Sequence, residues 1–142
     1  MLGTRRSRGT LLVAAAAAVA VSAPAYATGE GAPRIMARPH QLMVNTTTVL
    51  KGKHFKANST IKIVECSKTF WLAPSNPCMA ENATEVTTDA KGRFETNFKA
   101  GVCPEAERTK KPTQVICYVG EVVFGEDTGE LVGAAKLKVS YP

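Results

Sequence analysis

The sequence lacks an apolar run long enough to cross a membrane. Its longest such run, LLVAAAAAVAV, extends over residues 11–21, whereas a helix needs about 20 apolar residues to span the hydrocarbon core of a bilayer. No later segment is longer or more apolar. We therefore expect a protein without a membrane span.

The sequence also lacks the residue patterns of metal and catalytic sites. It has four cysteines but no C-x-x-C pair, and its two histidines, His40 and His54, are far from any cysteine in the chain. Structural zinc sites usually combine closely spaced cysteines or histidines. The G-x-S-x-G motif of many hydrolases is missing as well. We expect no metal, no cofactor and no enzymatic activity.

A helical apolar period is missing after the N-terminal region. Short β-branched runs separated by turn residues predict strands instead, and a turn is expected at DAKG, residues 89–92. The pattern is typical of an all-β, seven-stranded immunoglobulin-like β-sandwich. The expected strands are 34–38, 47–55, 60–66, 85–88, 93–98, 115–123 and 136–141. The residues expected in the core are Val49, Ile61, Ile63, Val86, Phe94, Phe98, Ile116, Leu137 and Val139.

The N-terminus has the layout of a secretory signal peptide. Three arginines precede the apolar run, and the small-residue motif Ala25-Tyr26-Ala27 follows it. We expect cleavage after Ala27, a flexible leader over residues 28–33, and one domain over 34–142. The secreted chain would carry 15 basic and 12 acidic residues, a mild excess of positive charge that indicates no particular partner.

The four cysteines, Cys66, Cys78, Cys103 and Cys117, all belong to the predicted domain. An even number of cysteines in an exported domain indicates two disulfides. Sequence alone does not choose among the three possible pairings. We favour the local one, Cys66–Cys78 with Cys103–Cys117, in which each bridge would contribute roughly 3 kcal/mol in the chain-entropy model.

Four short motifs occur in order along the domain: GKHFKAN at 52–58, IVEC at 63–66, VTTDAKG at 86–92 and CYVG at 117–120. They resemble the motifs G-x-G-(L/F)-x-(A/P)-G, V-x-Q-C, V-T-A-D-A-N-G and C-x-V-G of the neocarzinostatin-like apoproteins of actinomycetes. The third motif also keeps the family's offset from the cysteine before it. The resemblance covers most of the predicted domain and suggests a divergent member.

The resemblance implies a secreted seven-stranded sandwich with two local disulfides. Some members of the family hold a reactive enediyne chromophore in a cleft, protect it and release it to cut DNA. The chain departs from these carriers at several points: Ala83 stands where they have an aromatic residue, residues 98–103 leave no room for their long hairpin, and Tyr118 replaces a polar amide. The carriers are also acidic, whereas this chain is basic.

The segment between the first two cysteines carries three large apolar residues, Phe70, Trp71 and Leu72. In the resembling carriers this loop borders the cleft, so the three side chains are candidates for a ligand wall. They are equally well explained as a small core under their own loop. A contact patch for another protein is a third alternative. Tyr118 and Phe98 are further candidates, either for lining the cleft or for filling the core.

Two functional hypotheses follow. The first is a monomeric carrier of a small hydrophobic or aromatic ligand, held non-covalently, with antibacterial and DNA-directed activity only through that ligand. The second is an exported interaction or structural domain, at the cell surface or outside the cell, that keeps the fold without a ligand.

Overall fold

The computed structural model of the chain describes residues 31–104 and 113–142. The predicted signal peptide, residues 1–27, and the first half of the predicted leader, residues 28–30, lie outside the described residues. All regular structure in the described part is β-strand, and no helix there is long and apolar enough to cross a membrane. The nine strands are β1 (Arg34–Arg38), β2 (Gln41–Met43), β3 (Thr47–Lys53), β4 (Thr60–Cys66), β5 (Phe70–Leu72), β6 (Thr84–Thr87), β7 (Phe94–Lys99), β8 (Thr113–Phe124) and β9 (Thr128–Tyr141).

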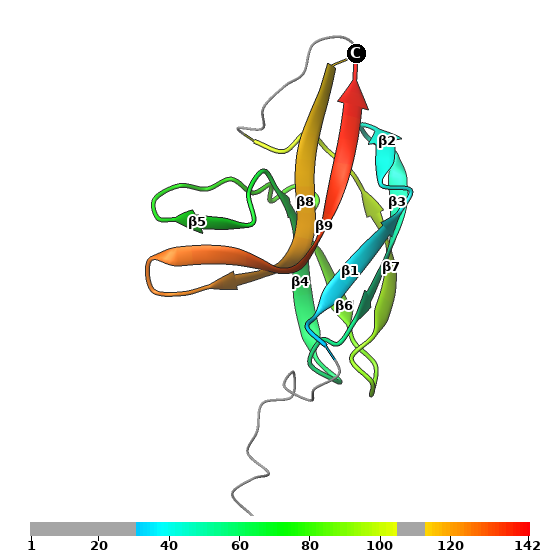
Figure 1. Ribbon diagram of the computed structural model, residues 1–142, viewed down its shortest axis with the longest axis vertical. Coiled ribbons are helices and arrows are strands. Elements are labelled where there is room, and N and C mark those ends of the chain that lie inside the picture. Colours follow the sequence, from blue (N-terminus) through cyan, green and yellow to red (C-terminus); the bar gives the residue numbers. More distant parts are fainter. Residues whose placement is uncertain (1–30, 105–112) are drawn as a thin grey trace, which may run out of the picture.

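The strands form two sheets (Figure 1). One has three strands in the order β1-β3-β7, and the other has the order β2-β9-β8-β4-β6 with β5 added to β9. All pairs are antiparallel except β2 with β9. The all-β sandwich is therefore confirmed, and each of the seven expected segments overlaps a strand, although the expected segment 136–141 covers only the last part of β9. The two additional strands, β2 and β5, have three residues each.

The core lies between the two sheets, and most of the expected core residues are buried there. Two expectations are wrong, because Val49 and Ile116 are only half-buried. In β3 the inward side chains are those of Thr48 and Leu50. Thr48 is accepted in the core because its hydroxyl donates a hydrogen bond to the Pro39 carbonyl oxygen at 2.6 Å.

In β8 the inward side chains are those of Val115, Cys117 and Val119. Ile116, which alternates with them, points to the other face of the sheet. The continuous apolar run around it gives no sign of which face is buried, because period-two alternation carries that information only when polar residues interrupt the run.

The β8–β9 hairpin extends beyond the sandwich. The register between the two strands shifts at Val119/Glu121, and a shift of this kind bends a strand pair. Past this point the hairpin turns away from the sheets and pairs with β5 (Figure 1). We call the three-stranded projection formed by β5 and residues 121–132 the arm.

The expected turn at residues 89–92 is confirmed. The Gly92 N–H donates to the Asp89 carbonyl oxygen at 3.0 Å, and one Asp89 carboxylate oxygen accepts from the N–H groups of Lys91 at 2.8 Å and Arg93 at 2.9 Å. These two hydrogen bonds lower the pKa of Asp89, and the bond from Arg93 has the larger effect. Gly92 has φ +74°, and a Cβ atom there would collide with the Phe55 carbonyl oxygen.

We predict that Gly92→Ala lowers the free energy of unfolding by about 3 kcal/mol. Alanine would be strained in the left-handed backbone conformation, and its Cβ atom would collide with the backbone of Phe55. Lys91→Ala, in the same turn and exposed, is the matched control and should change it by less than about 0.5 kcal/mol. Urea denaturation of the two variants measures the difference. Equal midpoints would contradict this explanation of the turn.

Candidate functional site

Each disulfide joins two cysteines that are consecutive among the four: Cys66 is bonded to Cys78, and Cys103 is bonded to Cys117. The local pairing is therefore confirmed. The first bridge closes a loop with a sequence separation of 12 residues, and β5 lies inside this loop. Closing a loop limits its freedom in the unfolded chain, so less entropy is lost when its residues are ordered.

Within the loop, side chains of β5 alternate between the two faces of the arm. Trp71 is only 6% exposed, whereas Phe70 and Leu72 are 54% and 60% exposed. The indole of Trp71 lies against the backbone of its cross-strand partner Gly129, where a Cβ atom would overlap the ring. A residue larger than glycine at this position would thus push the tryptophan out.

Trp71 belongs to a second apolar cluster, separate from the main core. Its other buried members are Val64, Cys66 and Leu131, and Tyr118 packs against them from β8. The cluster lies where the arm meets the larger sheet, so it fixes the arm on the sandwich. Trp71 is thus part of a small satellite core, whereas Phe70 and Leu72 lie on the opposite, exposed face of the arm.

A hollow of about 310 Å³ opens at the tip of the arm. Trp71 and Phe124 are the aromatic residues that line it, and Pro74 lies beside them. Phe124 is 71% exposed, more than any other large apolar residue in the described part of the chain. Cavities of this size are at the lower end of those that hold small molecules.

The five predicted ligand residues do not form one wall. Trp71 and Tyr118 share the satellite cluster, and Phe70 and Leu72 face solvent on the arm. Phe98 is 1% exposed and lies in the main core between the sheets. Phe124 was missed in the sequence because it follows the apolar stretch of β8 and looks like its continuation.

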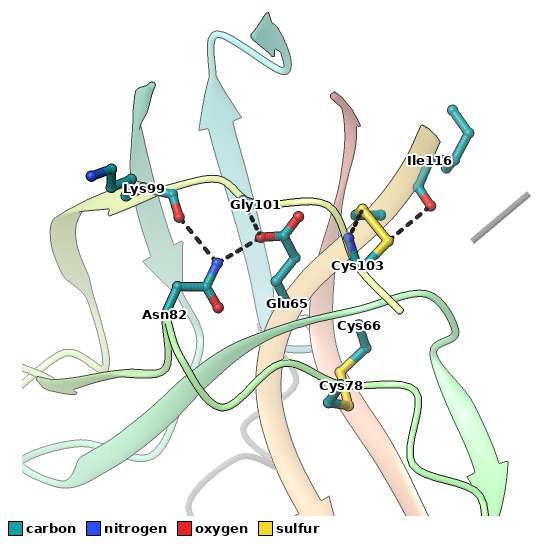
Figure 2. The surroundings of a disulfide bond; sticks show 9 residues. Glu65, Cys66, Cys78, Asn82, Lys99, Gly101, Cys103 and Ile116 are labelled. Atoms are coloured by element: carbon teal, nitrogen blue, oxygen red, sulfur yellow. Dashed lines mark hydrogen bonds between the residues drawn. A yellow bond between two sulfur atoms is a disulfide. The ribbon is translucent and has the colours of Figure 1, made fainter. Parts of the chain in front are cut away.

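Glu65 is a further residue that the sequence did not single out. It is fully buried and points from β4 toward the core, next to the Cys103–Cys117 disulfide (Figure 2). One carboxylate oxygen, Oε1, accepts hydrogen bonds from Asn82 Nδ2 at 2.7 Å and from the Gly101 N–H at 2.8 Å. The other, Oε2, has no hydrogen-bond partner among the described residues.

The Glu65 carboxyl links segments that are distant in sequence. Asn82 Nδ2 also donates to the Lys99 carbonyl oxygen at 3.0 Å, so one amide group connects β4, the segment after Cys78 and the end of β7 (Figure 2). Burial raises the pKa of Glu65 more than the hydrogen bonds from Gly101 and Asn82 lower it.

The oxygen and sulfur atoms around Glu65 are close enough for a metal site, since those of Glu65, Cys103 and Cys117 lie within 4.8 Å of one another. The two sulfur atoms are bonded to each other, however. Metals bind cysteine as the free thiolate, so this group is a structural junction in the oxidised protein.

Comparisons with known proteins support the fold. No family model and no curated protein sequence matches the chain. Among solved structures, macromomycin is similar with a TM-score of 0.50 and 18% sequence identity, over 78% of this chain and 100% of that chain. The likeness shows a neocarzinostatin-like fold. At this level of identity it concerns the fold alone.

We predict that Glu65→Gln stabilises the protein at neutral pH by about 1 to 2 kcal/mol, because a neutral amide removes a buried charge and keeps the acceptor for Gly101. The folded-state pKa of Glu65 is raised above the ordinary value of 4.5. The wild-type carboxyl therefore favours folding most below that value, and this contribution is lost as the pH rises through the folded-state pKa.

Chemical denaturation of both proteins between pH 3 and pH 8 tests this. The advantage of the variant should be present at neutral pH and should shrink toward acid. Glu85→Gln, at an exposed position of β6, is the control and should show no such dependence. An advantage of Glu65→Gln that is constant with pH would contradict the assignment to a buried charge.

Proposed function

We propose that the protein is a secreted, monomeric carrier of a small hydrophobic or aromatic ligand, which binds without a covalent bond at the arm. The observation that carries this proposal is the distribution of exposed apolar side chains. Of the six large exposed hydrophobic residues in the described part of the chain, four lie on the arm: Phe70, Leu72, Val123 and Phe124. Phe124 lines the hollow at the tip, whereas Phe70, Leu72 and Val123 lie outside it. Apolar groups gathered on one projection of a small domain are typical of a binding surface.

The construction of the arm supports the same proposal. Its loop is tethered by the Cys66–Cys78 bridge, and its base is held by the satellite cluster around Trp71. A surface that is ordered before the ligand arrives loses less entropy on binding. The hollow at the tip is lined by Trp71 and Phe124, and a planar ligand would contact such aromatic residues favourably.

The family resemblance supports a carrier and not an enzyme. Any antibacterial or DNA-directed activity would then belong to the bound ligand, and DNA would be contacted only through it. Export follows from the predicted signal peptide, and the two disulfides are consistent with an oxidising, extracellular location.

A second candidate function is an extracellular interaction domain. It is favoured by the position of β5, which pairs with β9 on one side and has no strand on its other side in the described part of the chain. An edge strand with exposed Phe70 and Leu72 is a template on which a strand of another protein can pair.

We predict that Trp71 emission shifts saturably when polycyclic aromatic compounds are titrated, because this is the only tryptophan of the chain and it lines the hollow. Phe124→Ala should weaken binding by about fivefold to tenfold, the effect of losing one aromatic contact of about 1 kcal/mol. Met43→Ala, which removes an exposed apolar side chain from β2, is the control and should bind like the wild type.

The titration also separates the two candidate functions. If no compound of a broad panel gives a saturable shift or a heat of binding, the carrier function is excluded. If compounds bind equally well to wild type and Phe124→Ala, the protein is a carrier but its site is not the tip of the arm.

A further inference from the structure

The outer face of the three-stranded sheet is built from alternating basic and apolar residues. On β1, Arg34, Met36 and Arg38 point to solvent, whereas Ile35 between them is buried. The sheet lies on the side of the molecule away from the arm (Figure 1). This face is therefore separate from the surface proposed to bind the small ligand.

Two adjoining hollows of about 470 Å³ each lie on this face, and both are lined by Met36, Lys51 and Glu95. Because they share these residues, they form one shallow depression over β1 and β3. We call it the basic groove and define it by Arg34, Met36, Arg38, Val49, Lys51 and Lys53.

The groove concentrates positive charge. Five cationic and two acidic residues line the two hollows, a net charge of +3. The described residues contain 12 basic and 9 acidic side chains, which is also a net charge of +3. The remaining described residues, seven basic and seven acidic, cancel in charge, so the excess positive charge of the described residues lies in the groove.

Both acidic residues that line the two hollows already have partners. Glu95 pairs with Lys51 at 3.8 Å, and Asp89 pairs with Arg93 at 3.2 Å. Arg34, Arg38 and Lys53 have no ion pair among residues 31–104 and 113–142. These three cations are consequently available to an anionic partner.

The available cations are placed at the two ends of the groove. Arg34 lies opposite Lys53 in the register of β1 and β3, and Arg38 lies four residues further along β1, about 13 Å away in an extended strand. Met36, which is 44% exposed, lies halfway between them, beside the Lys51–Glu95 pair. The face therefore presents two positive ends and an apolar middle.

This order selects the kind of partner. A polymer with closely spaced charges would place an anion next to the Glu95 carboxylate, and the groove has no exposed aromatic side chain on which bases would stack. An extended peptide has alternate side chains on one face about 7 Å apart. Acidic residues at its first and fifth positions and an apolar residue at its third would match the groove.

We propose that the basic groove binds an extended segment of a partner protein in which two acidic residues flank one apolar residue at alternate positions. One carboxylate would bind between Arg34 and Lys53, and the other would pair with Arg38, since guanidinium groups suit carboxylates geometrically. The apolar side chain would cover Met36. The proposal does not depend on the ligand-binding function of the arm.

Isothermal titration calorimetry with two peptides of identical composition tests the spacing. The peptide GDTLTDG has the proposed order, and GLTDDTG has the same charges side by side. We expect GDTLTDG to bind at low salt about tenfold more tightly, and we expect binding to weaken at high salt. Equal binding of the two peptides, or no binding of either, would overturn the proposal.

Matched variants test the site. Arg34→Gln with Arg38→Gln should weaken binding of GDTLTDG by about tenfold, and Met36→Ala should reduce the preference for leucine over glycine at its centre. Lys62→Gln with Lys136→Gln removes the same charge from exposed positions of the larger sheet and should leave binding unchanged. An equal loss in both double variants would show that only net charge matters and would contradict the groove.

Two other probes check the class of partner. The first is a short single-stranded DNA, and the second is vesicles containing phosphatidylserine. If either binds more tightly than GDTLTDG, the face belongs to nucleic acid or to a membrane, and the peptide proposal is wrong. All substituted side chains are exposed, so the variants should fold. Circular dichroism spectra identical to that of the wild type verify this.

Discussion

The structure of the arm depends on the closure of the Cys66–Cys78 loop. The strand inside this loop has only three residues, and an isolated strand of that length has too few contacts to stay paired. The bridge returns the chain to β4 directly after the loop, and β4 is paired with β8. With both ends fixed, β5 pairs with β9 and places Trp71 in the satellite cluster. The exposure of Phe70 and Leu72 follows from strand alternation.

The second disulfide and Glu65 play a comparable role on the opposite side of β4. The carboxyl of Glu65 accepts hydrogen bonds from Asn82 and Gly101, which come from segments near the two disulfides. The motif that resembles V-x-Q-C has a carboxylate where that family motif has an amide, so this chain keeps an ionisable group in its core. A buried charge with one oxygen lacking a partner is unfavourable, and its effect on stability depends on pH.

The molecule separates its surface properties between two ends. The arm carries exposed apolar side chains and the acidic residues Glu126, Asp127 and Glu130, whereas the outer face of the three-stranded sheet carries the excess of basic residues. The net charge of the chain does not reveal this arrangement, because it sums the acidic residues of the arm and the basic residues of the three-stranded sheet. A carrier built this way would have separate surfaces for a small ligand and for a protein partner.

The sequence predicted β4 and the end of β9 well, because alternation in TIKIVEC and in residues 136–141 reports which side chains face the core. It missed residues 128–135 of β9. It could not predict the inward face of β3, since the burial of Thr48 depends on the Pro39 carbonyl, nine residues away. The environment of Glu65 depends on residues 17 and 36 positions away. The arm depends on a register shift that no local pattern marks.

The most direct test of the account is hydrogen exchange of the backbone amides in Cys66→Ser with Cys78→Ser, compared with the wild type. If the closed loop holds the arm, amides of β5 and of residues 128–131 should lose protection while those of β3, β7 and the remainder of β8 keep it. Trp71 emission should shift to longer wavelength at the same time. Unchanged protection of β5, or an equal loss in both sheets, would contradict the account.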